Sequence, residues 1–114
     1  MRERFGGQPF RVSVDSEGET LFVRLYGELD LTCEERFNEE VRNLDKKHFD
    51  QVLFDLSGVT FIDSSGLWLL HVEFERIRTA GLEVAVLQGS DQVRGLLETT
   101  GLSKLIPVVE PGRA

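Results

Sequence analysis

Cysteine, histidine and long apolar runs are scarce in this 114-residue sequence, and each shortage excludes a class of protein. The single cysteine, Cys33, rules out an internal disulfide framework and suits a reducing compartment. The two histidines, His48 and His71, are far apart, so there is no Cys/His spacing typical of a metal site. No apolar run approaches the ~18–20 residues that cross a bilayer, and the first ten residues lack a signal peptide's apolar core. We therefore expect a cytoplasmic protein without a metal or a cofactor.

Basic residues are also fewer than acidic ones. Acidic residues outnumber lysine and arginine by 20 to 13, which gives a formal net charge of -7. Proteins that bind phosphate backbones cluster their basic residues, whereas here the arginines are scattered among acids. The same negative charge disfavours anionic membrane surfaces. We therefore expect neither nucleic acid nor a membrane as a partner.

The apolar residues that are present form a repeating pattern of strands and helices. Alternating residues predict two strands joined as a hairpin, unbroken apolar runs predict two strands buried on both faces, and a run containing proline predicts an edge strand. In chain order these strands are 10–15, 20–29, 50–56, 82–87 and 104–109. Helical spacing predicts three helices, at 32–47, from 64 to near 81, and between a cap at 89–91 and Gly101.

The resulting order, β-β-α-β-α-β-α-β, is typical of the α/β class. It predicts a small mixed sheet with an antiparallel hairpin, parallel strands and right-handed crossovers, and with helices packed mainly against the sheet. A chain of this length fits one domain. We expect that domain to cover residues 1–114, with a core at about 10–108 and loose ends at 1–9 and 109–114.

The polar stretch Asp63-Ser64-Ser65-Gly66 stands between two apolar runs. Residues 57–63 are expected to connect strand and helix, and Ser64 is a good candidate for the N-cap, as Thr32 with Glu35 is for a capping box on the first helix. From the residues alone, a helix cap is the commoner explanation of the stretch. The alternative is a modification site, because a helix N-terminus tolerates the added charge of a phosphoryl group.

Catalytic motifs are not found around these serines. Neither Ser64 nor Ser65 has the Gly-x-Ser-x-Gly spacing of a nucleophile elbow, and no phosphate-binding P-loop occurs. Cys33 lies on the apolar side of the first predicted helix, which favours a packed thiol over a reactive one. Trp68 could face either a partner or the core, and His71 is expected to be a half-exposed surface residue. We therefore expect a binding protein rather than an enzyme.

The segments "GELDLTCEERF", "VLFDLSGVTFIDSSGLWLL" and "GLSKLIPV" together resemble the STAS domains of bacterial anti-sigma factor antagonists, from about Phe10 to Val108. The resemblance implies a STAS fold with Ser64 as the phosphorylation site, while Ser65 is the neighbouring, usually unmodified hydroxyl. It also implies site-supporting or partner-contacting residues, which are Asp63, Ser65, Gly66, Asp30, Gly27 and Thr60.

The mechanism implied by this resemblance is partner switching. The unphosphorylated protein would bind an anti-sigma factor that is also a serine kinase, and would thereby release a sigma factor. Phosphorylation of Ser64 would end the complex, and a PP2C-type phosphatase would restore it. The alternative within the same family is a STAS scaffold or a regulatory module of a stress-signalling or transport complex.

Overall fold

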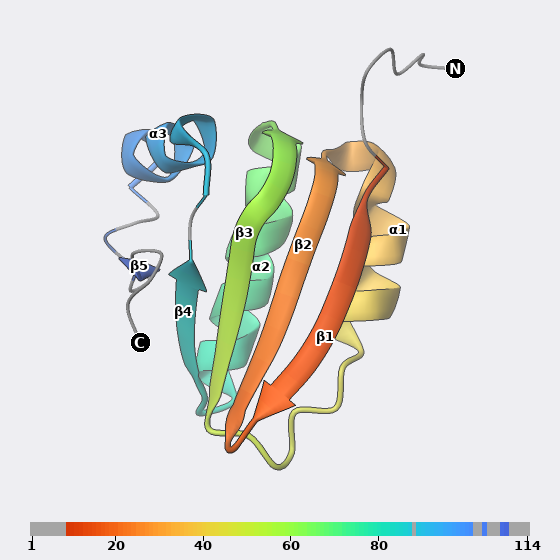
Figure 1. Ribbon diagram of the computed structural model, residues 1–114, viewed down its shortest axis with the longest axis vertical. Helices are drawn as coiled ribbons and strands as arrows, with labels where there is room; N and C mark the ends of the chain where they lie inside the picture. The colour runs from red at the N-terminus through yellow and green to blue at the C-terminus, as the bar shows by residue number, and fades with distance from the viewer. Residues whose placement is uncertain (1–8, 88, 102–103, 105–107, 110–114) are drawn as a thin grey trace.

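The computed structural model describes residues 9–87, 89–101, 104 and 108–109, which form a five-stranded sheet with helices against it (Figure 1). The elements occur in the predicted order: β1 (Arg11–Glu17), β2 (Thr20–Leu29), η1 (Leu31–Cys33), α1 (Glu34–Phe37), η2 (Asn38–Arg42), β3 (Gln51–Ile62), α2 (Ser64–Thr79), β4 (Glu83–Leu87), α3 (Asp91–Thr99) and β5 (Val108–Val109). The α/β class and the mixed sheet are therefore confirmed.

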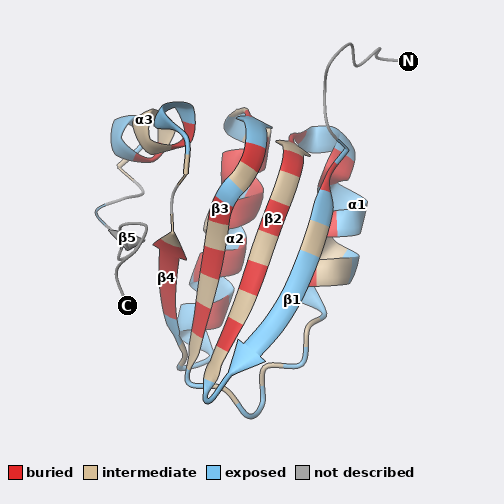
Figure 2. Cartoon of the chain, viewed as in Figure 1, coloured by how far each residue is buried: buried red, intermediate tan, exposed pale blue. Residues whose placement is uncertain are grey.

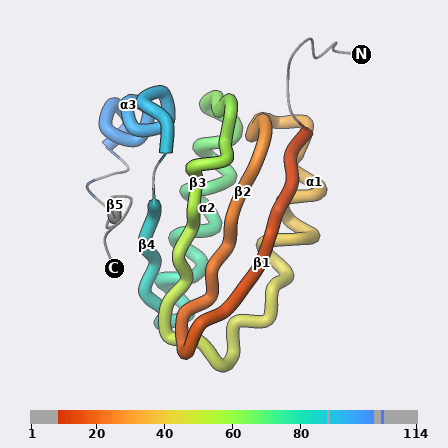
Figure 3. The backbone as a smooth tube through the Cα atoms, viewed as in Figure 1, coloured from red at the N-terminus to blue at the C-terminus, as the bar shows by residue number. Residues whose placement is uncertain are grey.

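The strands lie in the sheet in the same order as in the chain. β1 pairs with β2 antiparallel, and β2, β3, β4 and β5 are parallel neighbours. Each parallel connection therefore returns the chain through a helix or helical turn. β2 and β3 finish at the same end of the sheet. The helical segments that follow them, which begin with η1 and α2, start at that end (Figure 3).

The helices α1 and α2 cover one face of the sheet (Figure 1). In β2, Leu21, Val23 and Leu25 are at most 4% exposed and point toward α1 and α2, while the residues between them are half-buried (Figure 2). The prediction that the strand at 50–56 is buried on both faces is wrong, because its residues alternate between buried and half-buried in the same way. β4 does have three consecutive buried residues, Val84–Val86, as predicted.

The strand β3 is longer than predicted. Residues 57–62, expected to be a connection, continue β3 and pair with the second half of β2. The register shifts between Arg24 and Tyr26 and again between Gly27 and Glu28. The apolar run that predicted the strand stops at Leu56, before Ser57 and Gly58, and the irregular pairing with β2 that continues the strand is not visible in the local sequence.

The first helical segment is shorter than the predicted helix at 32–47. It begins as the turn η1, continues through α1, and ends at Arg42 with the wider π-type turn of η2. The predicted capping box is wrong, because the side chain of Asp30 accepts the hydrogen bond from the backbone of Thr32. Lys46 lies beyond the helix but donates to the carbonyls of Val41 and Leu44, both at 3.3 Å.

The helix α2 follows the predicted pattern closely. Leu67, Leu70, Phe74 and Ile77 are all at most 6% exposed and form its inner face. The cap of α3 is also confirmed, since Ser90 accepts from the backbone N–H of Val93 at 3.3 Å. None of the helices in the described ranges is both long and apolar enough to cross a membrane. Pro107, on which the edge-strand prediction rested, lies outside the described residues.

Candidate functional site

The paired carboxyl ends of β2 and β3 bring two aspartates to the same end of the sheet. Leu29 and Ile62 are register partners, so Asp30 and Asp63 each follow the last residue of neighbouring parallel strands. The backbone N–H of Asp63 donates to the carbonyl of Leu29 at 3.4 Å, which ties the two chain ends together. The first turn of α2 therefore starts beside the loop that opens η1.

Asp63, rather than Ser64, is the N-cap of α2. Its carboxylate accepts a hydrogen bond from the backbone N–H of Gly66 at 3.0 Å, and its extended backbone is typical of an N-cap. The prediction that Ser64 caps the helix is wrong, since Ser64 is already the first helical residue. The serine hydroxyl is therefore not used to hold the helix in place.

Gly66 fits where no other residue could without a shift of the backbone. A β-carbon at this position would overlap the backbone carbonyl of Leu29. The absence of a side chain allows α2 to start directly against the end of β2. The glycine of Asp-Ser-Ser-Gly therefore has a packing role that is independent of any partner.

Ser64 is exposed at the N-terminal end of α2, and Ser65 beside it is half-buried. Within the described part of the chain, the Ser64 hydroxyl has no hydrogen-bond partner. The first-turn N–H groups and the helix dipole make this corner of the molecule favourable for negative charge. An exposed, unbonded hydroxyl in that position can be modified without disturbing the helix.

The expectation that Asp30 contacts a partner at the surface is corrected by its burial. Its side chain is 1% exposed, so it lies beneath the surface instead of on the face that a partner would contact. It accepts from the backbone N–H of Thr32 at 2.9 Å and from the hydroxyl of the same residue. Asp30 thereby shapes the loop that places Leu31 and Thr32, both exposed, near the start of α2.

The thiol of Cys33 is packed beneath the same loop. It is buried and donates to the backbone carbonyl of Asp30 at 3.0 Å. Burial raises the pKa of the Cys33 thiol, so the neutral form is favoured. The interpretation of Cys33 as a packed residue agrees with this environment.

Gly27 and Thr60 affect the site through the backbone conformation of β2 and β3. Gly27 has φ +82°, a conformation that favours glycine, and it is buried where the ladder between β2 and β3 becomes irregular. Gly27 pairs with Val59 and Glu28 pairs with Phe61, which leaves Thr60 as an extra, exposed residue on β3. This bulge bends the end of β3 where it approaches α2.

Four large apolar side chains are exposed on η1, the end of β3 and α2. Leu31 is 65% exposed, Trp68 is 64% exposed, and Phe61 and Val72 are each 36% exposed. Trp68 therefore faces outward, which decides between the two orientations that the sequence left open. We call Leu31, Phe61, Trp68 and Val72 the apolar group.

On α2, the outward residues form a stripe that begins at Ser64. Trp68 and Val72 follow at intervals of four residues, and this spacing places them on one side of the helix. His71 is half-exposed, as expected, and its ring lies 5.6 Å from that of Trp68. Val72 was not recognised from the sequence, although its spacing from Ser64 and Trp68 was a signal that could have found it.

A shallow groove continues this stripe toward the other end of α2. Its volume is ≈ 530 Å³, and it is lined by the exposed side of the helix from Trp68 to Ala80. A larger hollow of ≈ 970 Å³ lies at the opposite end of the strands, lined by residues that include Glu19, Lys47 and Asp50. A hydrogen bond and repulsion from Asp50 raise the pKa of Glu19, and neither residue is part of the serine site.

The site combines an exposed hydroxyl with exposed apolar side chains. The described residues contain no cluster of three or more side chains that could hold a metal ion. The exposed serine, the capped helix and the apolar group instead suit recognition by another protein. The fold is that of a small α/β domain with a mixed sheet. The chain belongs to the STAS domain family, whose model matches residues 11–111.

Known proteins similar to this chain include antagonists of anti-sigma factors. An "Anti-sigma F factor antagonist" from Paenibacillus polymyxa is 27% identical over 88% of this chain and 86% of its own length. A crystal structure of an anti-sigma factor antagonist from Mycobacterium paratuberculosis has a TM-score of 0.79 at 22% identity, and covers 90% of this chain and 86% of that one. The phosphorylated form of the Bacillus cell fate determinant SpoIIAA has a TM-score of 0.65 at 20% identity, with 89% and 91% covered. At these identities the two structures establish the fold.

Proposed function

We propose that this protein is an anti-sigma factor antagonist that is switched off by phosphorylation of Ser64. In its unmodified form it binds an anti-sigma factor and thereby releases a sigma factor. The observation that carries the proposal is the position of Ser64, an exposed hydroxyl at the start of α2 with Trp68 one turn away. The similarity to the Paenibacillus polymyxa antagonist supports the same function.

The switch follows from the change of charge at this corner. A phosphoryl group adds about 1.5–2 negative charges at neutral pH. The N-terminus of α2 accommodates that charge, so the domain keeps its fold. A partner surface that fits a bare hydroxyl beside apolar side chains would instead face a bulky, hydrated anion. Binding therefore weakens without refolding, and the phosphorylated SpoIIAA structure shows that this fold exists with a phosphoryl group.

The partners follow from the same proposal. The anti-sigma factor is also a serine kinase, which transfers the γ-phosphoryl group of ATP to the Ser64 oxygen while ADP leaves. A PP2C-type phosphatase hydrolyses the phosphoserine and restores binding. The protein is then a ligand and a substrate in the cytoplasm. Asp63, Ser65 and Gly66 set the position of the hydroxyl, and the loop shaped by Asp30, Gly27 and Thr60 completes the partner-facing surface.

The test uses the anti-sigma factors of the source organism, purified and mixed with the wild-type protein and Mg-ATP. Phosphorylation is located by mass spectrometry, and affinity is measured before and after modification. We expect one phosphoryl group on Ser64 and a loss of affinity of at least tenfold, about 1.4 kcal/mol. Ser64→Ala should bind like the wild type and remain unmodified.

The matched control is Ser65→Ala, which removes the neighbouring hydroxyl and leaves Ser64 in place. It should be phosphorylated and released like the wild type. Phosphorylation that persists in Ser64→Ala, or an affinity that is the same with and without the phosphoryl group, would contradict the proposal. If no anti-sigma factor binds and all variants recover the same scaffold or transport components from a lysate, the protein is a STAS module of another complex.

A further inference from the structure

The strand β1 forms an edge of the sheet, because it pairs with β2 and with no other strand of the described chain. Six of its seven residues are exposed. An edge strand presents backbone N–H and C=O groups that can pair with a strand from another molecule. As far as the described residues go, the outer side of β1 is therefore available to a partner strand (Figure 1).

The hairpin turn determines which residues point to that free side. Glu17 and Thr20 flank the two-residue turn Gly18-Glu19, in which Gly18 has φ +58° and Glu19 has a negative φ, as in a type II′ turn. This turn hydrogen-bonds Glu17 to Thr20, and the direction of the backbone groups then alternates along β1. The outward groups therefore belong to Val12, Val14 and Ser16, and of these the N–H of Ser16 already donates to Asp15 Oδ1 at 2.9 Å.

The sequence of β1 is complementary to itself about Val14. If two copies pair antiparallel with Val14 opposite Val14, Arg11 of each copy faces Glu17 of the other. In the same register, Ser13 faces Asp15 and Val12 faces Ser16. All seven residues of the strand are used, and opposite charges meet at both ends.

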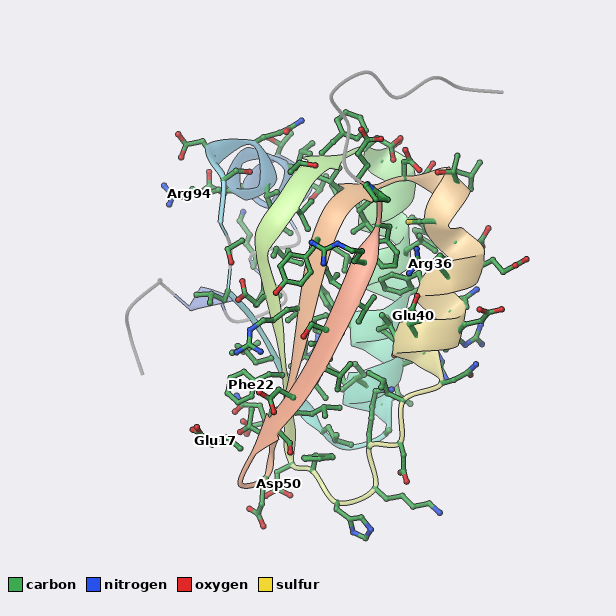
Figure 4. The ribbon with its side chains drawn as sticks, turned by 45° about the vertical axis from the view of Figure 1, so that its right-hand side comes forward. Glu17, Phe22, Arg36, Glu40, Asp50 and Arg94 are labelled. Carbon is green, nitrogen blue, oxygen red and sulfur yellow. The ribbon has the colours of Figure 1, made fainter. Side chains whose placement is uncertain are left out.

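The two charged residues at the ends of β1 lie on one face of the strand. Arg11 is exposed, and its guanidinium lies over the ring of Tyr26 of β2 at 4.7 Å, on the face of the sheet away from α1 and α2. Glu17 is exposed at the other end of β1 (Figure 4), and because the two positions are six residues apart, the strand period of two places it on the same face as Arg11. Val14, at the centre, is 42% exposed and would be covered by its counterpart.

We propose that β1 pairs with β1 of a second copy in this register, which joins two sheets into one. A single pair of strands buries little surface, and interfaces below about 1,200 Å² are typical of weak, transient complexes. The formal charge of -7 on each copy also opposes association. We therefore infer a weak dimer that becomes populated at high protein concentration. β3, which leads to Ser64, is separated from this edge by β2, so the inference is independent of the proposed function.

The first test is chemical cross-linking of the full chain in a Cys33→Ala background. A single cysteine replaces Val14, and a bifunctional methanethiosulfonate with a short spacer is added. We expect several-fold more covalent dimer than for Ser16→Cys, the matched control, because two copies of position 16 would be about 14 Å apart in this register. Equal cross-linking at 14 and 16, stronger cross-linking at Ser13→Cys, or none at Val14→Cys would overturn the proposal.

The second test exchanges the charges. In the Val14→Cys background, Arg11→Glu places two glutamates opposite each other, and Glu17→Arg places two arginines opposite each other. Each variant alone should lose most of its cross-linking. An equal mixture of the two should recover it, because every facing pair in the mixed dimer is again opposite in charge. A mixture that cross-links no better than either variant alone would rule out the register.

Discussion

The start of α2 rests directly against the backbone carbonyl of Leu29, and Gly66 is the residue that makes this contact possible. The contact joins the end of β2 to the first turn of the helix that carries Ser64. It also explains the glycine of Asp-Ser-Ser-Gly without reference to a partner. The exposed serine is therefore held by a rigid junction of strand and helix.

Replacing Gly66 with alanine should destabilise the domain. The added methyl group would overlap a backbone atom that cannot rotate away, and overpacking of this kind costs typically about 1–3 kcal/mol. Urea unfolding followed by circular dichroism measures the change. Gly95→Ala in α3 is the matched control, because its β-carbon would meet no atom within 4 Å. That variant should gain up to about 1 kcal/mol from helix propensity, and an equal loss in both variants would contradict the packing role.

The capping residue of α2 can be identified by its effect on stability. Asp63→Ala removes the acceptor of the Gly66 N–H and should cost about 1 kcal/mol, whereas Asp63→Asn keeps an oxygen at the cap and should cost much less. Ser64→Ala should change the free energy of unfolding by less than about 0.5 kcal/mol. Denaturant titrations of the three variants provide the comparison. A larger loss for Ser64→Ala than for Asp63→Ala would restore Ser64 as the cap.

The same pair of residues shows how far the sequence could predict the site. Local patterns identified the hairpin, the order of elements and the inner face of α2, since each depends on a period within one segment. They could not separate Asp63 from Ser64 as the cap, because both side chains accept hydrogen bonds and stand next to each other. The choice depends on the end of β2, which is distant in sequence.

The end of β3 was missed for a related reason. The extra residue at Thr60 shifts the register, so buried residues no longer alternate with half-buried ones as they do between Gln51 and Leu56. A bulge is specified by pairing with β2 and not by the local sequence alone. The exposure of Trp68 was also undecided, because whether a tryptophan on a helix is covered depends on which neighbouring elements pack beside it.

A buried ion pair links the loop after η2 to α2. Glu73 is 2% exposed, and its carboxylate lies 3.5 Å from the ammonium group of Lys46 and 3.0 Å from the guanidinium of Arg76. Lys46→Met should destabilise the domain by about 3 kcal/mol, since it leaves a buried carboxylate with one partner fewer. The exposed neighbour Lys47→Met is the control and should change stability by less than about 0.5 kcal/mol.

A second substitution shows whether that loss of stability comes from the buried charge of Glu73. Adding Glu73→Leu to Lys46→Met removes the buried charge that had lost its partner. Replacement of a whole buried pair by apolar residues is often close to neutral, so the double variant should recover most of the lost stability. Thermal unfolding of both single variants and the double variant gives the coupling energy. Strictly additive losses would show that Lys46 acts only through the carbonyls of Val41 and Leu44.

The outward orientation of Trp68 separates partner binding from stability. Trp68→Ala should change the free energy of unfolding by less than about 0.5 kcal/mol, because the side chain is 64% exposed. It should weaken binding to the anti-sigma factor by about 2 kcal/mol or more, as expected of a tryptophan at the centre of an interface. Titration calorimetry with the unphosphorylated proteins measures the affinity, and Thr79→Ala, exposed at the far end of α2, is the control. Wild-type affinity in Trp68→Ala would place the partner elsewhere, whereas a loss shared by Thr79→Ala would extend the interface along the whole groove.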